Sequence, residues 1–177
     1  TADDNHLYAM RLDSLAMYRM DKDRNWTLDE NDAPSMLPTA GAVGIAYDMP
    51  DGCARVMMLG RRGDDTLATV WGKTVIGTQA TQWVHYPWRE ENYNPLPALS
   101  RMSVIRYNGD LVAIGGDLDA AYVSPDNGVT WKKNYHHWSL PEGLDPTKAT
   151  GFTADNHGRV WLVNGNDVYC GSIPSQN

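Results

Sequence analysis

The chain has 177 residues and a formal net charge of −7, with 42% hydrophobic and 21% charged residues. This balance excludes a disordered tail or a collagen-like fibre, and the acidic charge argues against nucleic-acid binding, which needs clustered Lys and Arg. No apolar run reaches the ~20 residues of a membrane-spanning helix. Seven Trp and nine Tyr against one Phe favour an all-β fold, because amphipathic rings suit sheet faces.

Short alternating or apolar runs, punctuated by Gly, Asn and Asp, recur along the chain and predict strands and turns. The first repeating unit, residues 5–28, has three predicted strands: Leu7–Met10, Leu15–Met20 and Trp26–Leu28. The second unit, residues 42–88, has four: Ala42–Tyr47, Val56–Leu59, Leu67–Lys73 and Trp83–Tyr86. A four-stranded antiparallel unit of this kind is one blade of a β-propeller.

The clearest unit spans residues 102–138, where Asn108-Gly109 predicts a tight hairpin turn. Its predicted strands are Met102–Tyr107, Leu111–Ile114, Ala120–Val123 and a strand that begins at Trp131. The last unit, residues 150–173, has three: Gly151–Ala154, Arg159–Val163 and Val168–Ser172. Turn positions indicate that the first unit lacks its first strand and the last unit lacks its fourth.

We therefore predict one partial propeller domain over residues 1–177, with fourteen strands, or about three and a half blades. Propellers close with whole blades, and an unclosed ring exposes edge strands, so the complete ring is expected to have six or seven blades. The missing blades belong to a longer parent chain or to a second copy, since two copies would hold 28 strands, equal to seven blades of four. We favour the parent chain, because the missing strands lie where a longer sequence would supply them.

One eight-residue motif carries a specific spacing, Ser-x-Asp-x-Gly-x-Thr-Trp. It is matched at every fixed position by Ser124, Asp126, Gly128, Thr130 and Trp131. The hydroxyl and the carboxylate can accept hydrogen bonds from turn amides, the glycine permits positive φ, and the tryptophan can anchor the hairpin in the blade core. We interpret these five residues as structural.

The motif resembles the Asp-box, or bacterial neuraminidase repeat, of sialidase-like and sortilin-like propellers and of many uncharacterised secreted propellers of bacteria. In worn copies, Asp21 and Trp26 keep the spacing of Asp126 and Trp131, and elsewhere only Trp83 is retained. The resemblance implies a propeller and an extracellular, cell-surface or periplasmic location. It implies no catalytic residue, because the chain has no Arg-Ile-Pro stretch of the sialidase kind.

Candidate ligand-binding residues lie in the loops between the second and third strands of a blade and between blades. If the Asp-box joins the third and fourth strands, these loops share the opposite rim. The candidates are Arg61, Arg62, Asp64, Trp88, Arg89, Tyr93, Asp117, His137 and Trp138. Their rings, guanidinium groups and carboxylates suit a saccharide or an acidic ligand; the alternative is that they are solvated loop ends.

No metal, cofactor or catalytic group is expected. The pairs Asp64-Asp65 and Glu90-Glu91 would serve a glycosidase only at a suitable separation in space, and are otherwise solvated. Adjacent residues on a strand point to opposite faces, which argues against a metal at His136-His137. The two cysteines, Cys53 and Cys170, lack zinc-site spacing, so we expect two free structural thiols.

The favoured hypothesis is a non-catalytic, exported propeller module that binds a glycan or a protein on its loop-rich face. One alternative is a glycoside hydrolase or lyase whose site is completed by blades outside this chain; two carboxylates from different blades, facing each other across a central cleft, would favour it. Another is a structural or assembly module, which a flat, loop-poor rim would favour.

Overall fold

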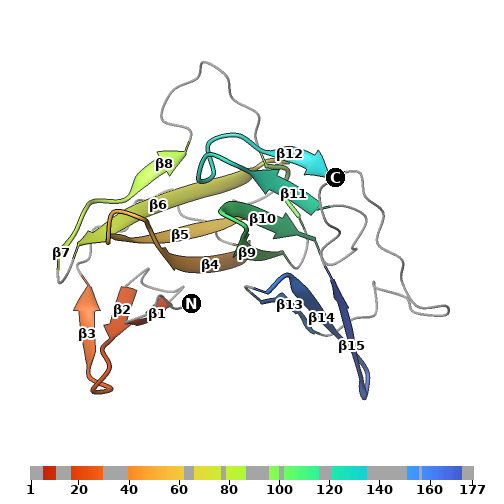
Figure 1. The fold of residues 1–177 in the computed structure, drawn as a ribbon, viewed down its shortest axis with the longest axis horizontal. Helices are drawn as coiled ribbons and strands as arrows, with labels where there is room; N and C mark the ends of the chain where they lie inside the picture. Colours follow the sequence, from red (N-terminus) through yellow and green to blue (C-terminus); the bar gives the residue numbers. More distant parts are fainter. Residues whose placement is uncertain are drawn as a thin grey trace.

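A computed structural model describes residues 6–10, 17–29, 40–61, 66–76, 79–86, 96–99, 102–115, 121–134, 151–155 and 157–172. Regular structure in these residues is entirely β-strand, in four antiparallel sheets that follow one another along the chain. The sheets fan around a common centre, with the first strand of each toward the middle (Figure 1). The predicted all-β architecture is confirmed.

The first two sheets contain the first eight strands. The first sheet has the order β1-β2-β3, with β1 (Leu7–Met10), β2 (Met17–Met20) and β3 (Trp26–Asp29). The second has the order β4-β5-β6-β7, and β8 also pairs with β6. Its strands are β4 (Ala40–Asp48), β5 (Ala54–Arg61), β6 (Ala68–Ile76), β7 (Gln79–Ala80) and β8 (Val84–Tyr86).

The last two sheets contain the remaining strands. The third sheet has the order β12-β11-β10-β9, with β9 (Ser103–Tyr107), β10 (Asp110–Ile114), β11 (Ala121–Ser124) and β12 (Lys132–Asn134). The fourth has the order β13-β14-β15, with β13 (Gly151–Ala154), β14 (Arg159–Asn164) and β15 (Asp167–Ser172). Strand β9 lies beside both β4 and β13, so the inner strands of the second, third and fourth sheets are neighbours.

The outer edge of the second sheet differs from the single predicted strand Trp83–Tyr86, because β7 and β8 pair with different parts of β6. Thr81 stands between them. Its backbone N–H donates to the Thr74 carbonyl oxygen at 2.8 Å, and its Oγ1 accepts from the Thr74 backbone N–H at 3.0 Å. The Thr81 hydroxyl thus takes the place of the backbone carbonyl that would accept this bond in a regular sheet. This substitution interrupts the outer strand and leaves two short strands.

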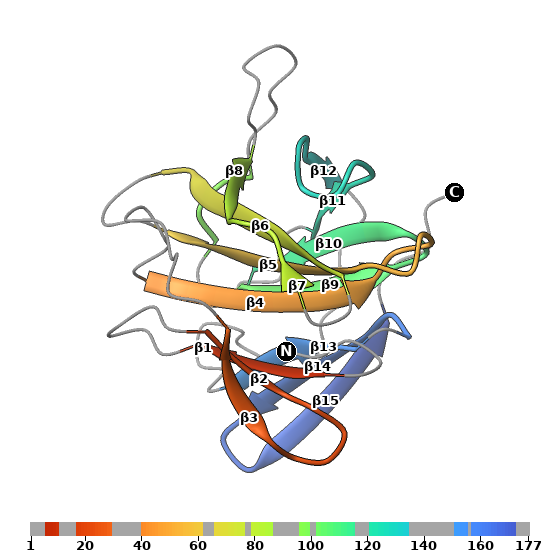
Figure 2. The ribbon, with the colours of Figure 1, turned by 90° about the vertical axis from the view of Figure 1, so that its left-hand side faces the viewer.

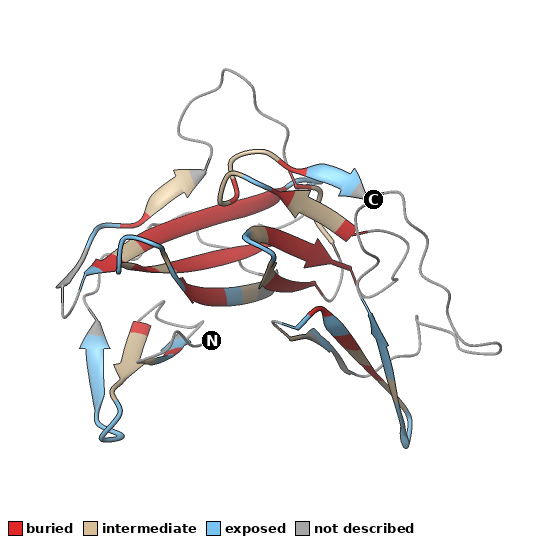
Figure 3. Cartoon of the chain, viewed as in Figure 1, coloured by how far each residue is buried: buried red, intermediate tan, exposed pale blue. Residues whose placement is uncertain are grey.

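The core lies between sheets, because successive strand residues point to opposite faces. On β4, Ile45 and Tyr47 face the third sheet, whereas Ala46 faces the first. Among the described residues, the three inter-sheet cores contain twelve, nine and six buried residues for the second–third, first–second and third–fourth pairs. Burial is therefore deepest in the two middle sheets (Figure 3).

Candidate functional site

The sheets present two rims with different construction. Short turns link β4 to β5, β9 to β10 and β13 to β14, and antiparallel alternation puts the β11–β12 turn on the same rim. We call this the turn rim; the β4–β5 and β13–β14 turns lie on the right in Figure 2. Strands β5, β8, β10 and β12 end at the other rim, here called the loop rim.

A closed set of hydrogen bonds holds the β11–β12 turn. Ser124 Oγ accepts from the backbone N–H of Gly128 and donates to Asp126 Oδ1, both at 2.8 Å. The same Oδ1 accepts from the Thr130 backbone N–H at 2.8 Å, and Oδ2 accepts from Thr130 Oγ1 at 2.6 Å. Since the Ser124 side chain is fully buried, each of these groups would be left unsatisfied if its partner were removed.

The same turn is fastened to the second sheet. The Trp131 indole donates to the Gly128 carbonyl oxygen at 3.1 Å, and its ring is 2% exposed in the second–third core. Gly128 has φ +94°, and a Cβ there would lie 2.7 Å from Met57 Cε. Asn127 Oδ1 accepts from the Tyr47 hydroxyl at 3.1 Å. The turn therefore serves both its own hairpin and the junction between two sheets.

A second junction on the turn rim was not anticipated from the sequence. The Arg106 guanidinium lies over the Tyr47 ring, with Cζ 4.4 Å from the ring centroid. Its Nη1 donates to the Asp48 carbonyl oxygen at 3.4 Å. A cation over an aromatic face in a partly buried site contributes about 0.5–2 kcal/mol. The only sequence signal is an arginine close to the predicted Asn108-Gly109 turn.

The worn copy of the motif keeps its carboxylate and loses its anchor. Asp21 Oδ1 accepts from the backbone N–H groups of Asp23 and Asn25, both at 2.9 Å. The bond from Asn25, four residues after Asp21, is equivalent to the bond from the Thr130 backbone N–H to Asp126. Trp26, however, is 47% exposed. It lies on the face of the first sheet that points away from the second sheet, and no described core includes it.

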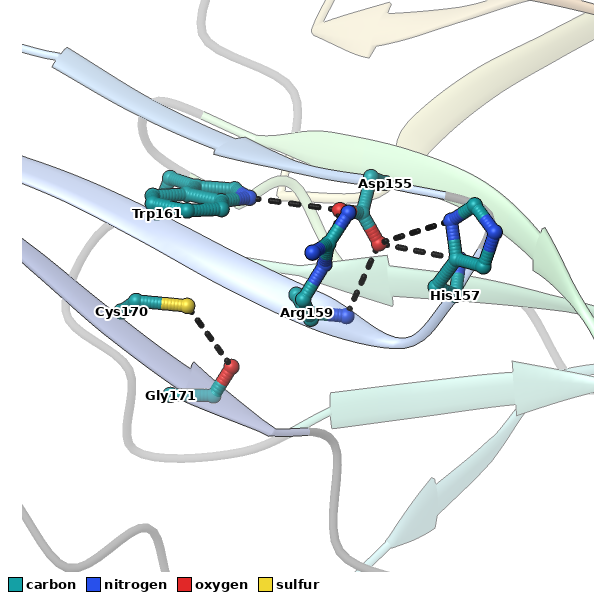
Figure 4. A network of polar contacts seen from close by, with 6 residues as sticks. All are labelled: Asp155, His157, Arg159, Trp161, Cys170 and Gly171. Carbon is teal, nitrogen blue, oxygen red and sulfur yellow. Dashed lines mark hydrogen bonds and ion pairs between the residues drawn. The ribbon is translucent and has the colours of Figure 1, made fainter.

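A third turn of this kind begins at Asp155 (Figure 4). The sequence predicted a turn at residues 155–158 but not its likeness to the motif, because Arg159 and Val160 stand where the motif has Thr and Trp. Asp155 Oδ1 accepts from the backbone N–H groups of His157 and Arg159 at 2.9 and 3.1 Å. Its Oδ2 accepts from Arg159 Nε at 2.6 Å and from the Trp161 indole at 3.4 Å. Gly158, at φ +75°, packs so closely on Tyr107 that a Cβ would lie 2.7 Å from its ring.

These hydrogen bonds govern the charge state of the turn carboxylates. Desolvation acts to raise the pKa of Asp155, but the bonds from Arg159, His157 and Trp161 outweigh it and lower that pKa to about 2. Desolvation likewise opposes the bonds from Thr130 and Ser124, whose net effect is a lowered pKa of Asp126. The pKa of Asp21 is also lowered, chiefly by the backbone N–H of Asn25. All three side chains are therefore ionised acceptors at neutral pH.

Acidification is expected to destabilise the chain below about pH 4. An unfolded Asp has a pKa of ~3.9, whereas the folded pKa of Asp155 is about 2. The resulting stabilisation is present above the unfolded pKa and is lost as pH falls through the folded value. Thermal unfolding between pH 5 and pH 2 should show a falling midpoint, with a shallower fall in Asp155→Asn. Equal slopes for the two proteins would contradict the assignment.

The sequence-predicted ligand residues fall mostly outside the described residues. Arg61 ends β5 and is exposed at the loop rim. The other candidates lie outside the described residues: Arg62, Asp64, Trp88, Arg89, Tyr93, Asp117, His137 and Trp138. So do the pairs Asp64-Asp65, Glu90-Glu91 and His136-His137. Each falls in a segment that follows the end of β5, β8, β10 or β12.

A group of aromatic and basic side chains lies on the second sheet toward the first. The Trp71 and His85 rings are 4.8 Å apart between centroids, and burial lowers the pKa of His85. Lys73 is 1% exposed, with Nζ 5.3 Å from the centroid of the Trp83 ring. Since Trp71 and Trp83 belong to the first–second core, we assign this group to packing. Trp83 was the only member that a motif had indicated.

Within the described residues, no cluster of three or more His, Cys, Asp or Glu side chains is arranged to hold a metal ion. Both cysteines are free thiols; Cys53 is half-buried and Cys170 exposed. Among the described residues, no helix is long and apolar enough to cross a membrane.

Four antiparallel sheets fanned around one centre, each packed face to face on the next, define a β-propeller. The model of the DUF6242 beta propeller domain matches residues 1–176, so the chain belongs to that family. A comparison with curated proteins found no match.

Proposed function

We propose that the chain is a non-catalytic module of an exported β-propeller protein, and that it binds a glycan or a protein at the loop rim. The supporting observation is that the polar side chains of the turn rim are used for structure, whereas the longest connections between sheets start at the loop rim. On the turn rim, the carboxylates of Asp126 and Asp155 and the guanidinium of Arg106 are occupied by the turns and sheet junctions themselves. Polar side chains committed in this way have little capacity left for a ligand.

The loop rim has the opposite character. Sixteen residues, 135–150, separate the end of β12 from the start of β13, and sixteen, 87–102, separate β8 from β9. Binding residues concentrate on long connections held by a rigid scaffold, and residues 96–98 of the second connection are fastened to residues 66–68 by backbone hydrogen bonds. The two connections contain Trp88, Arg89, Tyr93, His137 and Trp138, which offer aromatic faces for sugar rings and charged donors for acidic groups.

Alanine substitutions at Trp88, Arg89 and Trp138 are expected to weaken ligand capture. Loss of an aromatic or arginine anchor from the centre of a binding site typically costs about 2 kcal/mol or more, or roughly thirty-fold in affinity. Glycan and peptide arrays probed with the wild type and the three variants measure this directly. Lys132→Ala, an exposed charge in the strand that follows the β11–β12 turn, is the matched control.

Capture that survives all three loop-rim substitutions, or falls equally with Lys132→Ala, would contradict the proposed location. Release of reducing ends from a captured glycan would contradict the non-catalytic assignment and favour the hydrolase or lyase.

A further inference from the structure

The outward face of the first sheet is apolar across all three strands. The registers Leu7↔Met20↔Trp26 and Ala9↔Tyr18↔Leu28 put six residues on one face. Leu7, Trp26 and Leu28 are 39%, 47% and 50% exposed, and the other three are exposed or half-buried. We call these six residues the leading face. Exposed apolar patches of this kind mark interaction sites.

The opposite face of the same sheet shows what the leading face lacks. Tyr8 and Met17 alternate with the leading-face residues and are 4% and 3% exposed, because they pack on the second sheet. The same alternation builds the second–third and third–fourth cores. The leading face thus has the apolar pattern of the faces that pack on a neighbouring sheet elsewhere in the chain.

The fourth sheet, like the first, has one face packed on its neighbour and one exposed face. Val160 and Leu162 face the third sheet and are buried, whereas the registers Thr153↔Trp161↔Cys170 and Val163↔Val168 lie on the other face. Val168 is 63% exposed, and Cys170 and Thr153 are exposed. We call this second surface the trailing face. The first and fourth sheets flank one opening of the fan (Figure 1), and the trailing strand β15 is largely exposed (Figure 3).

We propose that a further antiparallel blade of the same polypeptide covers the leading face, and that the blades inserted in this opening also cover the trailing face. The occupant is a β-sheet with apolar faces, since that is what covers the equivalent face of each sheet within the chain. A second copy is the weaker candidate. The strand count suggested that two copies would form seven blades of four strands. The described strands of each chain, however, form four separate sheets, so two copies would supply eight sheets and not seven blades.

Cysteine reactivity tests this proposal, because Cys170 lies on the trailing face and Cys53 lies near the β4–β5 turn. The 177-residue chain and the full-length polypeptide that carries it are treated with the same thiol reagent, and modification at each cysteine is followed by mass spectrometry. We expect Cys170 to react at least ten-fold more slowly in the full-length polypeptide, with the Cys53 rate unchanged. Equal Cys170 rates in the two proteins overturn the proposal.

A paired substitution tests the leading face independently. Trp26→Ser with Leu28→Ser should lower the melting temperature of the full-length polypeptide by several degrees and leave that of the 177-residue chain nearly unchanged; Lys22→Ala, an exposed turn residue, is the control. Two results overturn the proposal. One is a reading frame that encodes no further blade. The other is a discrete dimer of the isolated chain, measured by sedimentation, that dissociates with the paired substitution.

Discussion

Replacement of Trp131 by alanine is expected to lower the free energy of unfolding by about 3–5 kcal/mol. The indole is 2% exposed and belongs to the second–third core, the buried cluster that also contains Met57 and Leu111. Its removal leaves a cavity between two sheets and also deletes the bond from Nε1 to the Gly128 carbonyl oxygen. Denaturant unfolding, followed by circular dichroism, measures the loss.

Trp26 provides the matched control for this substitution. It stands five residues after Asp21, as Trp131 stands five residues after Asp126, but its ring is 47% exposed. Trp26→Ala in the 177-residue chain should change the free energy of unfolding by about 0.5 kcal/mol, as is usual for surface substitutions. Similar losses for the two variants would show that burial does not distinguish the two copies of the motif.

Asp126→Ala is expected to destabilise the chain by about 1–3 kcal/mol. The carboxylate accepts three hydrogen bonds, from Ser124 Oγ and from the backbone N–H and hydroxyl of Thr130. Without it, a fully buried serine hydroxyl and a turn amide lose their acceptor. Asp126→Asn, which keeps one acceptor oxygen, should lose less than the alanine variant.

Ligand capture provides the second measurement on Asp126, because the turn rim lies opposite the proposed binding loops. Capture by the folded Asp126→Ala chain should equal that of the wild type. Loss of capture without loss of stability would assign a binding role to this turn and contradict the separation of the two rims.

Local sequence determined the strands and the tightest turns. The ranges of β1 and β13 agree with prediction, because alternating apolar residues specify a half-buried strand wherever the chain continues. Asn108-Gly109 adopts φ values of +52° and +90°, as a two-residue hairpin turn requires. The glycine of the eight-residue motif likewise has the positive φ that its position predicted. Each of these features depends only on residues close to it in the sequence.

Tertiary structure decided which motif residues reach a core. Trp26 and Trp131 occupy equivalent positions in sequence, but only Trp131 has a neighbouring sheet against its ring. The Asp155 turn and the contact of Arg106 with Tyr47 depend in the same way on groups that folding brings together. Backbone sterics and alternation act within a few residues, whereas burial requires a surface supplied by a distant part of the chain. The sequence alone therefore determined a propeller built of successive blades, and the packing of one sheet on the next decided which faces are cores and which remain exposed.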